Sequence, residues 1–333
     1  EGGICVLRKI TSFLFLALLS VALIACGNKE GSSEQSGSDS GSGEGLDSNI
    51  VTIATGGASG PYNIIATALA DVYTNKFDVN SRTQTTGASV ENLNLLAQGK
   101  VEMAFVMADA LTQAVNGEEA FSEPIENVRH VATLYPNVVQ IVARADAGIE
   151  TIEDLKGKRV AVGDQGSGVE VNARVLLNGH GITYDDMQVD YLGYAEAADG
   201  LSAGTIDAAF LTSGLPNASV LELAETVDIT IVSVDADKIE EIAKDHPYFI
   251  PYEIPADTYG NAEPVPTAAV PNMLVVREDL SEEDVYQLTK TFFESLDTLV
   301  NAHQAAADIS LENAQLGIVA PIHPGAERYY NEQ

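Results

Sequence analysis

The sequence has 333 residues, of which 49 are Asp or Glu and 17 are Lys or Arg, so its formal net charge is −32. An excess of negative charge of this size argues against nucleic-acid binding and against direct adhesion to anionic lipid, because both need basic patches. The two cysteines, Cys5 and Cys26, are too few for a metal site built on thiolates.

The first 26 residues have the pattern of an export signal. Arg8 and Lys9 precede an apolar run, 10–25, which ends at Leu23-Ile24-Ala25-Cys26. A run of this length is typical of a signal-peptide core rather than a membrane span, which needs about 20 apolar residues. The leucine three residues before a cysteine resembles the bacterial lipobox, which implies a signal peptide at 1–25 and lipid attachment at Cys26. The alternative is an uncleaved membrane anchor. Because no Met stands at its start, we expect a fragment or a misplaced start.

After Cys26, residues 27–48 are almost wholly Gly, Ser and acidic residues. This composition cannot bury a core and predicts a lipid-anchored flexible tether at 26–48, with a reach of about 25 Å. From residue 50 onward no second hydrophobic span follows. The remaining length suits one large domain or two lobes of ordinary size.

Short β-branched runs then alternate with helical patterns along the chain. The apolar runs predict strands at 51–54, 79–83, 103–106, 128–134, 138–144, 159–163, 188–191, 208–211 and 229–233. The periodic segments predict helices at 61–75, 89–98, 169–178, 282–299 and 309–316. This alternation predicts α/β lobes with mostly parallel sheet.

One pattern occurs twice in this order of elements. A glycine-rich loop between a strand and a helix, TGGASG at 55–60, is echoed by GDQGSG at 163–168. Each loop is followed by a similar step into an apolar strand, GKVEMAFV and GTIDAAFL. A proline-rich stretch, 251–272, then returns the chain toward an apolar run. We therefore expect lobe 1 at 49–141 plus 268–333 and lobe 2 at 142–267.

Both loops, and a third segment at 85–92, open predicted helices. Pro61 suits the first position of its helix, and Ser89 is the expected N-cap of the third. Free N–H groups at such helix starts bind anions readily, so three starts converging on a cleft would suit a carboxylate. Simple helix capping is the alternative for each. Neither loop matches a P-loop or a dinucleotide fingerprint.

Patterns for catalysis and metal binding are weak. The five histidines show no metal spacing and are expected to be surface or packing residues: His130, His180, His246, His303 and His323. An esterase using Ser167 is the enzymatic alternative, but the sequence shows no base paired with that serine. We expect no enzyme activity, no cofactor and no metal.

Four runs together resemble the TAXI-type solute receptors of TRAP transporters, from about Val51 to the C-terminus. They are TGGASGPYNIIATALADVY, QTTGASVENLNLLAQGKVEMAFVMAD, VAVGDQGSGVEVNARVLL and AAFLTSGLPN. The resemblance implies a two-lobed α/β fold like that of periplasmic binding proteins (type II), with mixed sheets, helices on both faces and a ligand cleft between the lobes.

The resemblance also implies a function. It implies a monomeric extracytoplasmic receptor, held at the membrane by its lipid, that captures a glutamate-like amino acid or a dicarboxylate. The receptor would deliver this ligand to a TRAP-type permease. An extracellular ligand-sensing module for a signalling partner is the alternative.

Carried onto this chain, the resemblance implies ligand-binding residues in every motif. They are Gly57, Ser59, Tyr62, Thr86, Ser89, Asn92, Asp109, Ser167, Gly168, Glu170, Ser213 and Pro216. We add Tyr135, at the expected lobe junction. Hydroxyls and helix starts would hold carboxylate oxygens, and Asp109 or Glu170 would hold an ammonium group.

Overall fold

The computed structural model describes residues 45–333. The predicted signal peptide, the lipid attachment at Cys26 and the tether as far as residue 44 lie outside them. The described residues, 45–333, belong to one compact unit. The first described residues are attached to the rest of this unit by two hydrogen bonds. The backbone N–H groups of Asp47 and Ser48 donate to the carboxylate of Asp284 at 2.7 and 3.0 Å. No helix within 45–333 is long and apolar enough to cross a membrane.

A ten-stranded mixed sheet runs through this unit in the main order β2-β1-β3-β10-β4-β7-β5-β6. Its strands are β1 (Ile50–Ala54), β2 (Asn80–Gln84), β3 (Met103–Met107), β4 (Val128–Arg144), β5 (Arg159–Ala161), β6 (Gln188–Asp190), β7 (Ala208–Ser213) and β10 (Val265–Arg277). Beside this path, β8 (Ile229–Val232) pairs with β4 and β9 (Ile250–Ile254) pairs with β10.

The balance of strand directions differs from the expectation. Within residues 45–333, four strand pairings are parallel and five are antiparallel. The prediction of mostly parallel sheet is therefore wrong. The reason is that β4 and β10 lie in the middle of the sheet and run antiparallel to every neighbour they have.

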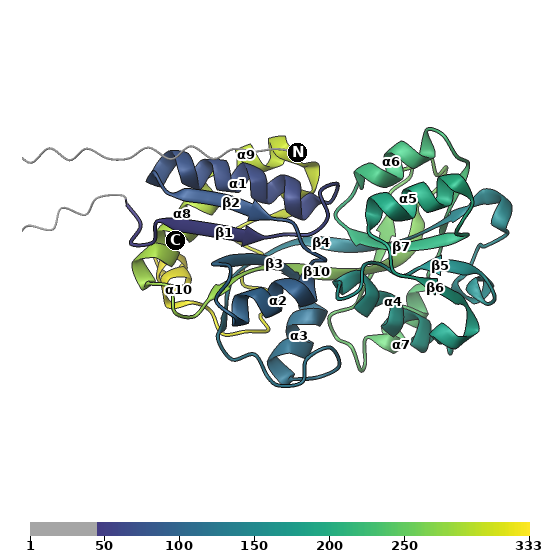
Figure 1. The fold of residues 1–333 in the computed structure, drawn as a ribbon, viewed down its shortest axis with the longest axis horizontal. Helices are drawn as coiled ribbons and strands as arrows, with labels where there is room; N and C mark the ends of the chain where they lie inside the picture. The colour runs from purple at the N-terminus through teal and green to yellow at the C-terminus, as the bar shows by residue number, and fades with distance from the viewer. Residues whose placement is uncertain (1–44) are drawn as a thin grey trace, which may run out of the picture. The chain divides into compact units, whose positions relative to one another are not determined.

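The two long strands connect the two ends of the sheet, as Figure 1 shows. The sequence predicted two strands at 128–134 and 138–144, but β4 is one strand of 17 residues. The strand continues through Pro136, which lies opposite Pro271 of β10. The two residues that lack an N–H therefore face each other, at the same point of the ladder of hydrogen bonds. Both predicted lobe boundaries fall inside β4 or β10, and the sheet is continuous across them.

Two groups of helices cover the sheet (Figure 1). The first group contains α1 (Pro61–Phe77), α2 (Ser89–Ala97), α3 (Ala108–Asn116), α8 (Glu282–Glu294), α9 (Leu296–Ala302) and α10 (Pro324–Asn331). The second contains α4 (Gly168–Gly179), α5 (Tyr194–Ala203), α6 (Ala218–Ala224) and α7 (Ala236–Ile242). Short 3-10 turns occur at Ala145–Ala147, Ile152–Leu155, Tyr184–Asp186 and Gln304–Asp308.

The prediction of a helix at 309–316 is wrong, because this segment forms turns. Its carbonyl groups bond to a strand instead of continuing a helix. The backbone N–H of Thr133 donates to the Ala314 carbonyl at 2.7 Å, and the Thr133 hydroxyl donates to the Leu316 carbonyl at 2.6 Å. The helix predicted at 282–299 is two helices, α8 and α9, which meet at Ser295.

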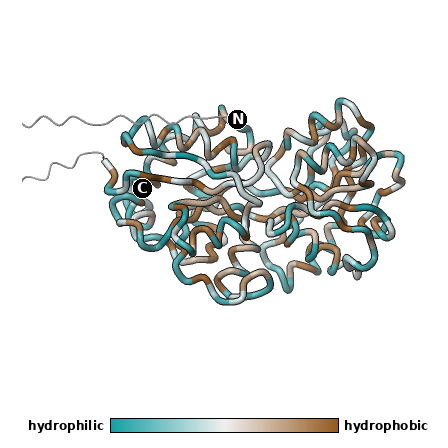
Figure 2. Tube along the Cα trace, viewed as in Figure 1, coloured by the Kyte–Doolittle hydropathy of each residue, from teal (hydrophilic) through white to brown (hydrophobic). Residues whose placement is uncertain are grey.

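The core follows the strands, where apolar residues gather inside both groups (Figure 2). Helix α1 shows how the sequence builds it. Ile65, Leu69 and Tyr73 recur every four residues, so they share one face of the helix, and all three are fully buried. Burying an aliphatic side chain of this size contributes about 1.5–3 kcal/mol. This packing fixes the loop before α1 relative to the sheet.

Candidate functional site

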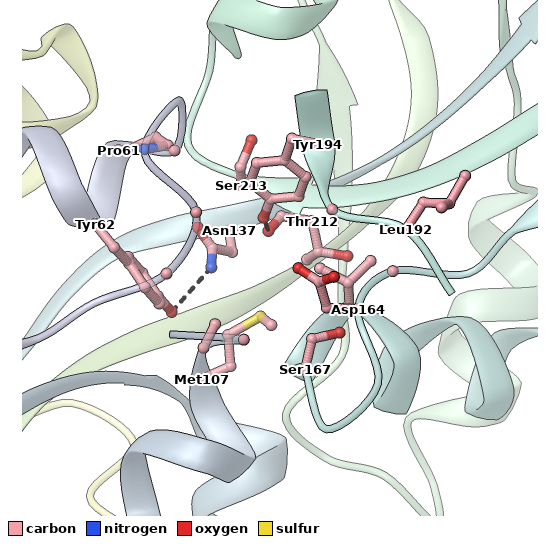
Figure 3. A pocket seen from close by; sticks show the side chains of 18 residues that line it. Pro61, Tyr62, Met107, Asn137, Asp164, Ser167, Leu192, Tyr194, Thr212 and Ser213 are labelled. Carbon is pink, nitrogen blue, oxygen red and sulfur yellow. Dashed lines mark hydrogen bonds between the residues drawn. The ribbon is translucent and has the colours of Figure 1, made fainter. Parts of the chain in front are cut away.

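A cavity of about 40 Å³ lies where the glycine-rich loops of both helix groups meet (Figure 3). Its wall consists of Gly56, Gly57, Gly60, Pro61, Tyr62, Gly87, Ala88, Met107, Asn137, Gly163, Asp164, Ser167, Val169, Leu192, Gly193, Tyr194, Thr212 and Ser213. The starts of α1, α2, α4 and α5 therefore surround one space.

Glycines allow these helix starts to approach closely. A Cβ on Gly60 would lie 3.2 Å from the Tyr194 ring, so the absence of a side chain at Gly60 lets this ring pack against the start of α1. Gly163 has a φ of +94°, and a Cβ there would lie 2.6 Å from the Cβ of Val169. Pro61 is the first residue of α1, as predicted, where its missing N–H costs no hydrogen bond.

The start of α2 differs from the expectation. Ala88, with a φ of 75°, occupies the N-cap position, and Ser89 is the first helical residue. The Ser89 hydroxyl is not a cap because it accepts the backbone N–H of Met107 at 3.1 Å. The prediction of Ser89 as N-cap is therefore wrong, and this serine joins α2 to β3.

A chain of buried hydrogen bonds forms one side of the cavity. The Asn137 side-chain amide donates to the Tyr62 hydroxyl at 3.1 Å, and that hydroxyl donates to the Asn272 side chain. Burial raises the pKa of Tyr62 well above its ordinary value, so this hydroxyl stays protonated. The Asn137 Oδ1 atom is buried and has no hydrogen-bond partner within residues 45–333.

The end of β7 forms the opposite side. The Tyr194 hydroxyl donates to the Thr212 carbonyl at 2.6 Å. The Ser213 hydroxyl accepts from the side chains of Gln140 and Asn217 at 3.0 and 3.1 Å. Thr212 is fully buried, and its hydroxyl has no partner in the described part of the chain.

Asp164 is the acidic residue of the wall. Burial raises its pKa above the ordinary value, and the nearby carboxylates of Glu196 and Glu91 raise it further. The wall residues, all within the described range, include no Lys, Arg or His. A negative charge placed in this cavity would therefore depend on backbone N–H groups and hydroxyls.

The predicted ligand-binding residues divide into two sets. Gly57, Tyr62, Ser167 and Ser213 lie in the cavity wall. The others lie outside it: Ser59, Thr86, Ser89, Asn92, Asp109, Tyr135, Gly168, Glu170 and Pro216.

Several of this second set hold the wall in place. The Asn92 side chain donates to the carbonyls of Thr55 and Phe105 at 2.6 and 2.8 Å and accepts the Thr86 hydroxyl at 2.6 Å. It therefore joins β1, α2 and β3 behind the glycine loops. A Cβ on Gly168 would lie 2.2 Å from the Met107 side chain, so glycine lets α4 pack directly against the first helix group.

Two predicted residues make contacts between the helix groups. The Ser59 hydroxyl, before α1, lies 3.1 Å from that of Ser219 in α6. Asp109 in α3 is fully buried and accepts a hydrogen bond from Asn172 in α4.

The remaining predicted residues have other surroundings. Glu170 accepts from the Tyr184 hydroxyl at 2.8 Å and pairs with Arg174 at 3.2 Å. The Tyr135 hydroxyl is buried without a partner within residues 45–333. Pro216, after the cis peptide bond to Leu215, is half-buried.

The wall residues that sequence reasoning missed include Asn137, Leu192, Tyr194 and Thr212. For Asn137 a signal was present, because it is a polar residue inside the apolar run from 128 to 144. A buried polar side chain in a strand is more informative than another apolar one. For Tyr194 and Thr212 no local pattern stands out.

The polar groups near the cavity can be checked for metal-binding and catalytic arrangements. In residues 45–333 no three His, Cys, Asp or Glu side chains are placed to hold a metal ion. The Ser167 hydroxyl accepts the backbone N–H of Glu170 at 3.0 Å and so caps α4. Within the same range it has no hydrogen bond to a histidine that could act as its base. The five histidines bond instead to backbone groups or to a tyrosine.

The NMT1-like family matches residues 53–333 of this sequence. The chain belongs to the NMT1-like family. The match runs from the end of β1 through α10, including all the loops that surround the cavity.

Solved structures share the fold. One is described as a periplasmic transporter, at 14% identity and a TM-score of 0.54, with 86% of this chain and 93% of that chain covered. A protein from Bordetella bronchiseptica matches at 18% identity and a TM-score of 0.54, covering 86% and 83%. The binding-protein component of a phosphonate ABC transporter from Pseudomonas aeruginosa matches at 12% identity and 0.50, covering 78% and 79%. The family member described here thus has the α/β fold of periplasmic binding proteins, as predicted.

Proposed function

We propose that this chain is an extracytoplasmic solute-binding receptor that serves a transporter. The observation that carries the proposal is the cavity where loops of both helix groups meet, because two residues of its wall have buried polar atoms without a hydrogen-bond partner. Asn137 Oδ1 and Thr212 Oγ1 have no partner within residues 45–333. A buried polar atom without a partner costs about 1–3 kcal/mol, so a ligand that supplies the missing hydrogen bonds is favoured.

The glycine loops support a ligand with a carboxylate. Gly57 leaves open space where a side chain would stand, so a ligand can approach the backbone before α1. The start of α4 lies in the same wall, and helix starts favour negative groups. We therefore propose a small carboxylate or an amino acid as the ligand class, in line with the resemblance to TAXI-type receptors.

The size of the cavity supports a hinge mechanism. The cavity is small, at about 40 Å³. A solute such as glutamate enters only if the two helix groups first separate and then close over it. Three contacts would form on closure: Ser59 with Ser219, Asp109 with Asn172, and Arg174 with Glu119 at 2.6 Å.

The delivery step belongs to the same proposal. The lipobox-like sequence before Cys26 supports anchoring to the outer face of the cell membrane, and the order of the motifs supports a TRAP-type permease as the acceptor of the solute. Two proteins that share the fold are described as a periplasmic transporter and as a component of an ABC transporter. A binding role, rather than an enzymatic one, agrees with both.

A thermal-shift screen of amino acids and dicarboxylates tests the proposal. A ligand at 100 times its Kd stabilises the folded chain by about 2.7 kcal/mol, which raises Tm measurably. The protein is first stripped of bound solute by unfolding and refolding. Absence of any shift across the panel, with protein shown to be folded, would overturn the receptor function.

A pair of threonine variants makes the screen specific to the cavity. Thr212 and Thr291 are both buried, with hydroxyls that have no partner within residues 45–333, but Thr291 lies in α8, outside the cavity wall. Thr212→Val should reduce the ligand-induced shift, and Thr291→Val should leave it unchanged. Equal effects of the two variants would contradict ligand binding at this cavity.

A further inference from the structure

The charges around the cavity narrow the class of solute, and this inference rests on the proposed receptor function. Asp164 is the only charged side chain in the wall, whose residues all belong to the described range. It is half-buried, and Figure 3 shows it beside Thr212 and Ser167. A solute in the cavity therefore meets a carboxylate and no cationic side chain.

Two further carboxylates surround Asp164. A Cβ on Gly193 would lie 2.8 Å from an oxygen of Glu196 and 2.9 Å from an oxygen of Asp164, so both carboxylates approach this one glycine. Glu91 accepts the backbone N–H of Gly87 at 2.7 Å, and Gly87 also lies in the wall. The three negative side chains thus meet at the edge of the cavity.

None of these three carboxylates forms an ion pair within residues 45–333. The ion pairs formed within residues 45–333 involve other acidic residues. The rise in the pKa of Asp164, caused by burial and by Glu196 and Glu91, is the effect expected of a carboxylate without a compensating charge. A cation in the cavity would remove this cost, whereas a second anion would increase it.

The buried polar atoms of the wall fit the same kind of ligand. Asn137 is 3% exposed and Thr212 is 0% exposed. Asn137 Oδ1 accepts hydrogen bonds only, and Thr212 Oγ1 can accept one; neither has a partner within residues 45–333. An ammonium group has three donors and no acceptor. Asp164, Asn137 and Thr212 all belong to the wall of this one small cavity, so a single ammonium group can lie among them.

We propose that the solute carries a protonated primary amine, which lies against Asp164 and donates to Asn137 and Thr212. The solute is then an amino acid rather than a dicarboxylate. Its carboxylate lies toward the open backbone of Gly57 and the start of α4. Asp164 thereby takes the ammonium-binding role that the sequence assigned to Asp109 or Glu170.

The same charges connect ligand binding to closure. Glu91 belongs to α2 of the first helix group, whereas Glu196 belongs to α5 of the second and Asp164 lies in the loop before α4. Closing the cavity brings these like charges together, which opposes closure. The ammonium group offsets this repulsion, so an amine-bearing solute stabilises the closed form and a deaminated solute does not.

Matched pairs of solutes test the inference by isothermal titration calorimetry on the full chain, stripped of bound solute. The pairs are alanine with propionate and glutamate with glutarate, which differ in the ammonium group, and 4-aminobutyrate retains an amine beside one carboxylate. We expect binding of at least one amine and affinity at least about thirtyfold weaker for its deaminated partner. Equal or tighter binding of the deaminated acid would overturn this inference and leave the receptor function intact. Absence of binding by every solute would overturn both.

Variants of single carboxylates test whether amine binding depends on Asp164 and its neighbour Glu196. Asp164→Asn should weaken amine binding at least about thirtyfold. Glu196→Gln, at an exposed site, should weaken it less. Asp199→Asn is the matched control, because it removes one charge from the exposed surface of α5, outside the cavity wall, and should leave the affinity unchanged. Amine affinity retained by both Asp164→Asn and Glu196→Gln would contradict the inference.

Discussion

Asp109 shows how burial changes the chemistry of a single carboxyl group. It is fully buried beside Asn172, which donates to one of its oxygens, and its other oxygen has no partner within residues 45–333. Burial raises the pKa of Asp109 to about 7, although the nearby backbone N–H groups of Asp109 and Ala110 lower it in part. The protonation state of this carboxyl group in the folded protein therefore changes with pH near neutrality.

This raised pKa predicts a loss of stability with rising pH. The folded protein holds the Asp109 proton more tightly than the unfolded chain, whose aspartates have a pKa of about 3.9. The stabilising contribution is fully present below about pH 4 and is lost as the pH rises through about 7. Asp109→Asn removes this titration, so its free energy of unfolding in urea should fall less between pH 5 and pH 8 than that of the wild type. Identical pH dependence of the two proteins would contradict the prediction.

At the scale of elements, the C-terminal helix α10 depends on one glycine. Gly325 packs against α8 so closely that a Cβ would lie 2.3 Å from the Glu282 carbonyl oxygen and 2.5 Å from the Tyr286 nitrogen. Farther along α10, the ring of Tyr329 stacks on Phe293 at 5.6 Å. Because the atoms near Gly325 belong to the backbone, no rotamer change relieves the contact.

Gly325→Ala should therefore destabilise the protein. Alanine gains about 1 kcal/mol of helix propensity over glycine, but crowding in a packed contact costs about 1–3 kcal/mol. With backbone atoms this close, we expect crowding to exceed propensity and Cm in urea to fall. Gly57→Ala is the matched control, since a Cβ there meets open space, and its stability should change by no more than about 0.5 kcal/mol. A gain in stability for Gly325→Ala would show that α10 does not pack as described.

At the scale of the whole molecule, the narrow cavity predicts a change of shape on ligand binding. Under the proposed hinge mechanism, an amino acid enters this small cavity, of about 40 Å³, only after the two helix groups separate. Small-angle X-ray scattering should therefore give a smaller radius of gyration with saturating ligand than without it. A compound that gives no thermal shift serves as the control. An unchanged radius of gyration on saturation would contradict the hinge mechanism.

Much of the fold was predictable because its signals are local. Pro61 marks the start of α1 through its own geometry, and the glycine-rich runs mark the loops before α1 and α4. The segment at 309–316 was mispredicted because the carbonyls of Ala314 and Leu316 bond to Thr133, far away in the sequence. Strand direction was mispredicted for the same reason, since the pairing of β4 with β10 joins distant parts of the chain.

The site was predictable only in part. The glycine-rich loops were predicted correctly because their local sequence, rich in glycine, is enough to indicate a loop. Asn137 and Thr212 were not, because their proximity arises from the pairing of β4 with β7, where Val138 lies opposite Ser213 and Val139 opposite Thr212. Asn92, expected to contact ligand, donates hydrogen bonds to the carbonyls of Thr55, directly after β1, and of Phe105 in β3.

The sequence by itself determined the alternation of strands and helices, the positions of the glycine-rich loops and the excess of acidic residues. These properties depend on neighbours along the chain or on composition alone. The tertiary structure decided which polar side chains line the cavity and which form hydrogen bonds inside the protein. It also placed Asp164 in the cavity wall and Asp109 beside Asn172 of α4. The physical reason is that burial and hydrogen-bond partners come from long-range strand pairing and helix packing, which bring together residues that no local pattern relates.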